Sequence, residues 1–120
     1  MSVKRIVPNI YSDDLEKSKI FYCDFLGLEI VMDMSWIITF ASKENPTGQI
    51  NVLENDTNQI LNNKAVFLSI EVLDVDTFYQ KAIELNLNIV YPITDESWGV
   101  RRFFVKEPNG GTLNIVSHKK

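Results

Sequence analysis

The chain has 120 residues, of which 45% are hydrophobic and 23% are charged, proportions typical of one ordinary globular domain, expected here over residues 1–120. Its formal net charge of −4 argues against a nucleic-acid partner, because binding to the phosphate backbone requires a basic face. The sequence has no apolar run near the roughly 20 residues of a membrane-spanning helix, and no charged-then-apolar leader; this predicts no membrane partner and a cytoplasmic location.

The first expected elements are a strand and a helix. Residues 4–11 alternate between polar and apolar, as in a half-buried strand. Residues 12–14 then offer helix caps, with acidic charge in the first turn, and Gly27 ends the helix. Cys23 lies beside the apolar stripe of this helix and, as the only cysteine, excludes an internal disulfide framework. The stripe comprises Leu15, Ser18, Phe21, Tyr22, Phe25 and Leu26.

Three strands are expected after this helix, and the second half of the sequence repeats the whole order. Residues 65–72 alternate as a strand, Asp74 caps the next helix, and residues 108–111 have the composition of a hairpin turn. Residues 55–64 are polar enough to link the two halves. The second helix has the stripe Val75, Phe78, Tyr79, Ala82 and Leu85. The remaining strands are expected near residues 28–34, 36–42, 48–54, 87–91, 99–106 and 112–118.

An internal repeat supports this division. Residues 26–31 recur as residues 85–90, with both leucines, the isoleucine and the valine identical. Gly27 matches Asn86, and both residue types tolerate the left-handed backbone conformation that ends many helices. The two halves therefore look like copies of one unit.

A second match, near the end of each half, pairs Asn51 with Asn114. The predicted architecture is an α+β fold of two tandem βαβββ modules, at about residues 1–56 and 64–120.

Two stretches resemble the glyoxalase/bleomycin-resistance/dioxygenase (vicinal oxygen chelate) superfamily. Residues 14–28, with an FY pair before an LG pair, resemble its first-helix signature. Residues 97–103 followed by residues 107–110 resemble the penultimate hairpin of its bleomycin-resistance-like branch. The resemblance implies that each module forms a curved mixed sheet and that two modules close a groove facing away from the helices. It also implies a homodimer, because single two-module chains of this family generally dimerise.

Enzymes of this family bind a metal through His, Gln or Glu on the first and last strand of each module. Carried over to this sequence, these positions fall on Val7, Phe67, Asn51 and Asn114. Valine and phenylalanine have no donor atoms, and an amide oxygen is a weak ligand for zinc, iron or nickel. The single histidine, His118, cannot make a family-type site. We therefore expect no catalytic metal and no cofactor.

The groove face follows from strand alternation within this resemblance. Asn51 and Asn114 either contact a ligand or satisfy each other and buried backbone. Trp98 resembles the aromatic residue that stacks on planar ligands in the bleomycin-binding branch, with a loop or interface anchor as the alternative. Arg101 and Arg102 point to opposite faces, and Arg101 is taken as the ligand residue, with the sign of the ligand charge left open. The other expected ligand residues are Val7, Asn9, Tyr11, Phe67, Ser69 and Glu71.

The sequence thus favours a metal-independent protein that binds a small organic molecule and sequesters an antibiotic or an aromatic metabolite. The alternative is an enzyme, a divergent metal-dependent lyase, isomerase or dioxygenase of the same superfamily, with Glu71, Tyr11 and His118 as its acid–base groups. A structural module that binds a partner peptide is a third possibility, for which the sequence has no motif.

Overall fold

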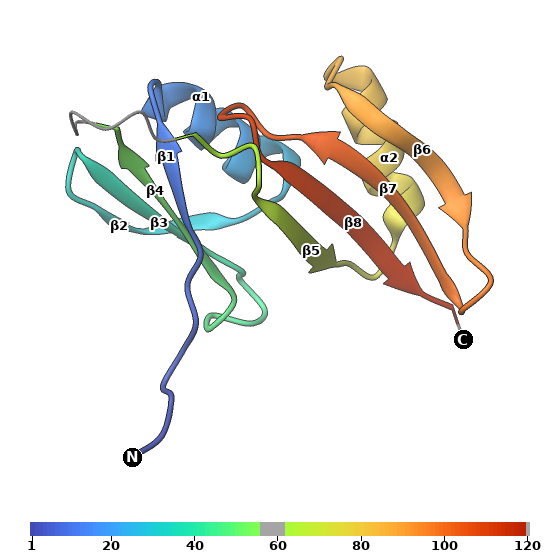
Figure 1. Ribbon diagram of the computed structural model, residues 1–120, viewed down its shortest axis with the longest axis horizontal. Helices are drawn as coiled ribbons and strands as arrows, with labels where there is room; N and C mark the ends of the chain where they lie inside the picture. Colours follow the sequence, from blue (N-terminus) through green and yellow to red (C-terminus); the bar gives the residue numbers. More distant parts are fainter. Residues whose placement is uncertain (56–61, 120) are drawn as a thin grey trace. The chain divides into compact units, whose positions relative to one another are not determined.

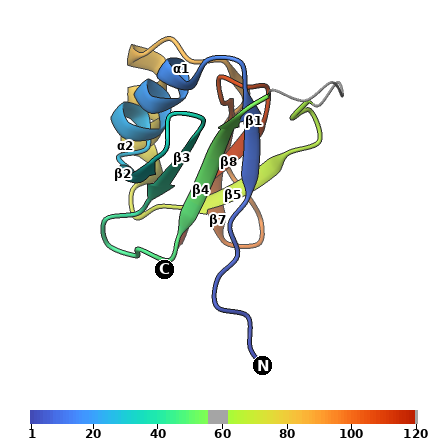
Figure 2. The ribbon, with the colours of Figure 1, turned by 90° about the vertical axis from the view of Figure 1, so that its left-hand side faces the viewer.

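The computed structural model describes residues 1–55 and 62–119 (Figure 1). The chain divides into two compact units, Met1–Asn63 and Lys64–Lys120. Each unit contains one four-stranded sheet with helix packed on one face (Figures 1 and 2). This confirms the predicted α+β fold of two tandem βαβββ modules. None of the helices in the described residues is long and apolar enough to cross a membrane.

The first unit has the strand order β1-β4-β3-β2. β1 runs parallel to β4, and the other neighbouring strands are antiparallel. The elements are β1 (Asn9–Ser12), α1 (Leu15–Lys19), the π-helix η1 (Ile20–Phe25), β2 (Glu29–Asp33), β3 (Ile37–Ala41) and β4 (Gln49–Glu54).

The second unit repeats this topology with the order β5-β8-β7-β6, in which β5 is parallel to β8. Phe103, Val105, Leu113 and Ile115 are fully buried, and Tyr79 of α2 meets Phe103 edge-on with ring centroids 4.9 Å apart. The elements are β5 (Phe67–Glu71), α2 (Val75–Glu84), β6 (Ile89–Asp95), β7 (Val100–Lys106) and β8 (Thr112–His118).

The first strand is shorter than the sequence predicts. It begins at Asn9, although the alternating pattern begins at residue 4. The ladder ends with the bond from the Asn51 N–H to the Pro8 oxygen, 3.0 Å long. Gln49 of β4 lies farther back, but Pro8 has no N–H with which to bond to it. Ile6, which the pattern suggested as part of a strand, is 80% exposed.

The first helix also differs from its expected form. α1 continues directly into η1, so that the predicted single helix has a wider turn in its second half. Its stripe is buried as predicted, with Ser18, Tyr22 and Phe25 in the core. Burial also raises the pKa of the neighbouring Cys23 thiol, which suits a small hydrophobic residue and not a nucleophile.

The repeat correctly predicts how both helices end. Gly27 has a φ of 72° and Asn86 a φ of 56°, so both adopt the left-handed conformation. The N–H of the next residue then bonds back into the helix, from Leu28 to Tyr22 in the first unit and from Leu87 to Ala82 in the second.

Candidate functional site

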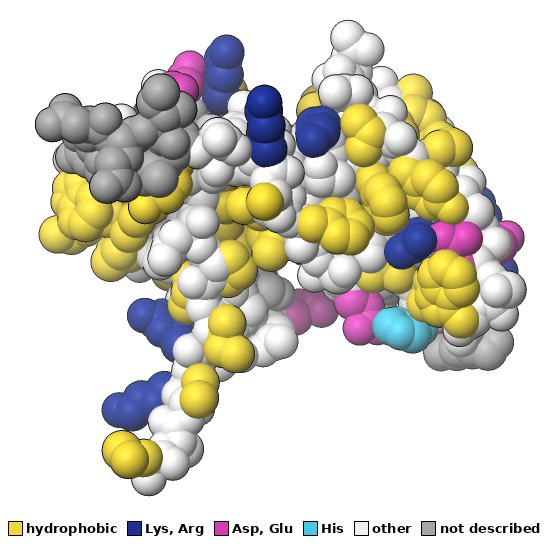
Figure 3. Space-filling model, viewed as in Figure 1, with side chains coloured by type: hydrophobic (Ala, Val, Ile, Leu, Met, Phe, Trp, Pro, Cys, Tyr) yellow, Lys and Arg dark blue, Asp and Glu magenta, His cyan; other side chains and the backbone are white. Residues whose placement is uncertain are grey.

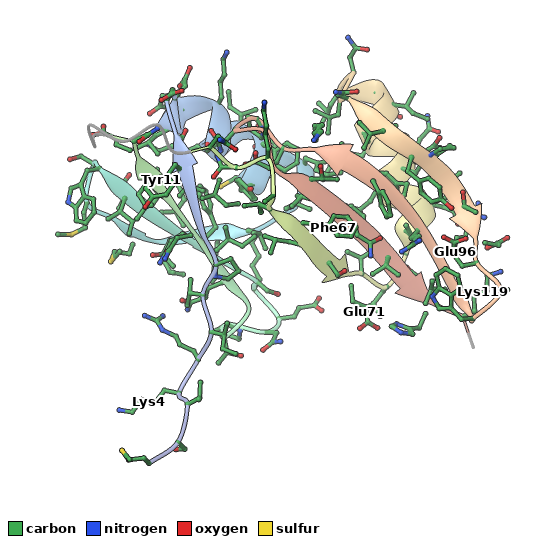
Figure 4. All side chains as sticks on the ribbon, in the orientation of Figure 1. Lys4, Tyr11, Phe67, Glu71, Glu96 and Lys119 are labelled. Atoms are coloured by element: carbon green, nitrogen blue, oxygen red, sulfur yellow. The ribbon has the colours of Figure 1, made fainter. Side chains whose placement is uncertain are left out.

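The second sheet has one face on α2. We call its opposite face the ligand face, because Phe67, Ser69, Glu71 and Asn114, which the sequence predicts as ligand residues, share it. Directly paired residues share a face in a sheet. The register places Ser69 beside Asn114 and Asn114 beside Phe104, and it places Glu71 beside Val116 and Val116 beside Arg102. Figure 4 shows Phe67 and Glu71 projecting from β5. Hydrophobic side chains gather over this sheet in Figure 3, with charged groups and the histidine close by.

Aromatic side chains dominate this face. Phe67 meets Phe104 edge-on with centroids 5.0 Å apart, and Tyr91 lies against Phe104 with centroids 4.7 Å apart. Phe67 and Trp98 remain 54% and 65% exposed. We call Phe67, Tyr91, Trp98 and Phe104 the aromatic platform; it offers ring surface for contact with a planar molecule.

Arg102 lies over the aromatic platform. Its guanidinium carbon is 4.8 Å from the ring centroid of Phe104, 5.1 Å from that of Trp98 and 5.6 Å from that of Tyr91. Nε of Arg102 donates to Oε2 of Glu96 at 2.7 Å, and the Tyr91 hydroxyl donates to the same oxygen at 3.0 Å. Glu96 thus holds the guanidinium in place among the rings.

The structure corrects the expected position of Arg101. This residue lies on the opposite face, where its Nη2 is 2.8 Å from Oδ1 of Asp76 on α2 and its Nη1 is 3.2 Å from Oδ1 of Asp95. These bonds, the one to Asp76 first, raise the pKa of Arg101. Successive residues of a strand alternate between faces, so Arg102 takes the place on the ligand face that was expected for Arg101.

Each of the two matched asparagines is bonded within its own unit. In the first unit, Asn51 Oδ1 accepts the Thr39 hydroxyl at 2.6 Å and Asn51 Nδ2 donates to Asn9 Oδ1 at 3.0 Å. In the second, Asn114 Nδ2 donates to the Ser69 hydroxyl at 3.0 Å. Asn114 is only 6% exposed, and its Oδ1 has no hydrogen-bond partner among the described residues.

The other expected ligand residues of the first unit are Asn9 and Tyr11 on β1 and Val7 just before it. Asn9 and Tyr11 alternate with the buried Ile10 on β1, so they face away from the core. The Tyr11 backbone is fixed by Asn63, whose side chain bonds both its N–H and its carbonyl at 3.1 and 2.7 Å. Val7 precedes the strand and is half-buried.

A histidine–carboxylate pair stands at the end of the ligand face of the second unit. His118 Nδ1 is 2.9 Å from Glu71 Oε2, and both side chains are about two-thirds exposed, at 64% and 65%. With Glu71 as the acceptor, the second ring nitrogen of His118 is left as a base.

The positions that hold a metal in the family enzymes do not fit one here. Val7 and Phe67 have no donor atoms, and both polar groups of the Asn51 amide already bond to Thr39 and Asn9. Only Asn114 keeps a free oxygen, and one neutral amide is a poor ligand. In the described part of the chain, no three His, Cys, Asp or Glu side chains are grouped to hold a metal ion.

Sequence reasoning missed four residues of this arrangement. Tyr91, Glu96, Arg102 and Phe104 come together on the ligand face, but none was among the expected ligand residues. Strand alternation could have placed two of them together, because Arg102 and Phe104 are two residues apart on β7 and therefore lie on the same face. Tyr91 joins them through a register shift in the β6–β7 pairing, which alternation alone does not predict.

Comparison with known proteins identifies relatives of this fold. The family model described as Glyoxalase/Bleomycin resistance protein/Dioxygenase superfamily matches residues 3–115. No curated protein sequence matches the chain significantly.

Solved structures share the fold over nearly the whole chain. A protein of unknown function from Agrobacterium tumefaciens str. C58 is 24% identical, with a TM-score of 0.74 and coverage of 98% of this chain and 94% of that one. The hypothetical protein SA1046 from S. aureus is 23% identical, with a TM-score of 0.79 and coverage of 98% and 95%. A superfamily member from Sphaerobacter thermophilus DSM 20745 is 20% identical, with a TM-score of 0.80 and coverage of 98% of each chain. At these identities the likeness concerns the fold alone.

Proposed function

Since this chain belongs to the Glyoxalase/Bleomycin resistance protein/Dioxygenase superfamily, we propose that it binds a small organic molecule without a metal and sequesters it, as an antibiotic or an aromatic metabolite. The observation that carries this proposal is the aromatic platform. Phe67 and Trp98 expose large ring surfaces beside polar groups that can orient a ligand. A cluster of exposed apolar side chains on a protein surface commonly marks a binding site.

Binding without a metal is supported by the donor chemistry at the family positions. A Lewis-acid site needs several charged or imidazole ligands around one ion. The amides of Asn51 and Asn114 bond instead to neighbouring hydroxyl and amide groups. Of these groups, only Asn114 Oδ1 has no partner among the described residues. An amide oxygen can accept a hydrogen bond from a ligand and supplies no redox chemistry.

Fluorescence titration of the Trp36→Phe variant tests this function, because Trp98 is then the only tryptophan. A panel of one-ring and two-ring planar compounds is added, and thermal unfolding is followed in parallel. We expect some members to quench Trp98 and to raise the melting temperature, since a ligand that binds only the folded state stabilises it. Phe67→Ala should weaken binding by about 2–10-fold, the equivalent of one lost stacking contact.

The matched control is Leu73→Ala, which also removes an exposed apolar side chain but lies outside the aromatic platform. It should leave the affinity unchanged. If no compound quenches Trp98 and none protects against unfolding, the binding function is wrong.

The same proposal includes a cytoplasmic homodimer. Its support is the edge strand β2, where Ile30, Val31 and Met32 are exposed, because apolar edges of this kind commonly mark contacts between chains. Sedimentation velocity should show one species of twice the 13.8 kDa chain mass. A single species at the chain mass would contradict it.

An acid–base enzyme is a second candidate, favoured by one observation, the 2.9 Å contact between His118 and Glu71. A carboxylate that orients the ring leaves the other nitrogen as a base on the ligand face. Turnover of a ligand found in the titration, abolished by His118→Gln, would support the enzyme over the binder. A ligand recovered unchanged after long incubation would count against the enzyme.

A further inference from the structure

We infer that the ligand of the aromatic platform carries a planar acidic group, a carboxylate or a close equivalent, which Arg102 binds through its two terminal nitrogens. The inference rests on the proposed binding function and adds the chemical class of the ligand.

The bonding of Arg102 leaves its terminal nitrogens available. Its Nε is taken by Glu96 at 2.7 Å, and among the described residues neither Nη atom has a hydrogen-bond partner. A guanidinium has five N–H donors, so four remain. They form the planar fork that matches the two oxygens of a carboxylate. The side chain is 23% exposed, so a ligand can reach it from the solvent side.

The guanidinium is also held in one orientation before any ligand arrives. Three aromatic rings surround it, and Glu96, whose side chain is only 11% exposed, is itself fixed by the Tyr91 hydroxyl. A group ordered in advance loses less conformational entropy on binding, so its hydrogen bonds contribute more to affinity.

The same contacts decide the sign of the ligand charge. Aromatic ring faces attract cations, but over Phe104, Trp98 and Tyr91 that place is already occupied by the guanidinium. A cationic ligand stacked there would lie against a like charge. The carboxylates of this face are also engaged, Glu96 by Arg102 and Glu71 by His118.

Isothermal titration of three probes of similar size tests the inference: 2-naphthoate, its neutral amide, and 2-naphthylmethylammonium. We expect the wild-type protein to bind the carboxylate at least about tenfold more tightly than the amide, because hydrogen bonds between charged groups are the stronger kind. The ammonium probe should bind most weakly. Benzoate and benzamide repeat the comparison on a single ring.

Substitutions at the two neighbouring arginines assign the effect. Arg102→Gln should abolish the preference for carboxylate, and Arg102→Lys should keep only part of it, since an ammonium lacks the planar fork. Arg101→Gln is the matched control, because Arg101 bonds to Asp76 and Asp95 on the other face; it should keep the full preference. The double variant Glu96→Gln/Arg102→Gln removes both charges and should also bind carboxylate and amide equally.

The outcomes separate this inference from the proposed function. If the three probes bind with equal affinity and Arg102→Gln changes nothing, the acidic ligand is wrong while the binding function stands. If none of the naphthyl or phenyl probes binds, both the acidic ligand and the binding function are wrong. If Arg102→Gln fails to fold, the comparison of Arg102→Lys with the double variant decides, and an undiminished carboxylate preference in both overturns the inference.

Discussion

The buried carboxylate of Glu107 organises the turn between β7 and β8. Its Oε2 accepts the backbone N–H groups of Asn109 and Gly111 at 2.6 and 2.8 Å, and its Oε1 accepts the Asn109 side chain at 2.8 Å. Glu107 is only 2% exposed. A buried charge is tolerated when hydrogen bonds satisfy it, as they do here.

We therefore expect Glu107→Ala to lower the free energy of unfolding by about 3 kcal/mol, because the backbone donors of the turn lose a charged acceptor. Glu107→Gln keeps one acceptor oxygen and should cost less. Urea denaturation followed by circular dichroism measures both, with the exposed Glu44→Ala as a control that should change little. A loss as small in Glu107→Ala as in the control would mean that the turn does not depend on this carboxylate.

Arg101 and Arg102 illustrate how much one position matters in a strand. The two residues are chemically identical neighbours, yet one bonds to Asp76 on α2 and the other lies over the aromatic platform. Exchanging their roles would require a one-residue shift of β7, which would also turn the buried Phe103 and Val105 outward. The core therefore determines which arginine can meet a ligand.

At the scale of elements, the combined helix α1–η1 buries one face and exposes the other. Phe25 is in the core, where its ring lies 5.2 Å from that of Phe21, while Ile20 on the same π-helix is exposed. A π-helix has more residues per turn than an α-helix, so its buried face must be read from the structure.

Phe25→Ala should lower the free energy of unfolding by about 3–5 kcal/mol, the usual cost of emptying a buried aromatic site. Ile20→Ala, the control on the exposed face, should change it by less than about 0.5 kcal/mol. Equilibrium denaturation compares them. Equal effects would show that η1 does not pack in solution as it does here.

The second helix depends on its first residues. Asp74 caps α2 by accepting the Thr77 hydroxyl at 2.8 Å and the Thr77 N–H at 3.3 Å. These bonds, the one from the hydroxyl first, lower the pKa of Asp74. A carboxylate whose pKa is lower in the folded state stabilises the fold above the unfolded pKa of about 4, and this contribution is lost as pH falls through the folded pKa.

The melting temperature of Asp74→Asn should thus lie below that of the wild type at pH 7, and the difference should shrink below about pH 4. Thr77→Val removes the bond that lowers the pKa most, and in that background the pH dependence should be weaker. Scanning calorimetry across this range measures both. A difference between wild type and Asp74→Asn that stays constant down to pH 2 would contradict this account of the cap.

At the scale of the whole molecule, two copies of one unit have diverged in their polar rows. The row Thr39–Asn51–Asn9 in the first unit is linked by hydrogen bonds across three strands. In the second unit an aromatic residue, Phe104, stands beside Asn114 where the first has Thr39 beside Asn51. The two units thus share the fold but differ in the residue beside the matched asparagine.

In both units, the asparagine at the family's metal position bonds to neighbouring side chains. We therefore expect that the purified protein needs no metal. After dialysis against EDTA, addition of zinc, nickel, iron(II), manganese or calcium ions should leave the melting temperature unchanged, since a metal that binds only the folded state would raise it. Elemental analysis of the untagged protein complements the thermal measurement. Stoichiometric metal together with a raised melting temperature would reverse the assignment and favour an enzyme.

The sequence by itself determined the order of strands and helices, the doubled unit, and the helix ends at Gly27 and Asn86. These features follow from periodicity and local backbone preference, which act over a few neighbouring residues. Strand alternation also correctly grouped Phe67, Ser69, Glu71 and Asn114 on one face.

Only the tertiary structure decided where β1 begins, how η1 widens, and which arginine shares a face with the aromatic platform. Each depends on the partner across the sheet: β1 begins where its pairing with β4 begins, at Asn9 beside Asn51, and the register of β7 against β8 sets Arg102 beside Val116. The register shift in β6 then brings Tyr91 to Phe104. Pairing between strands distant in the sequence is governed by packing, and no local pattern contains it.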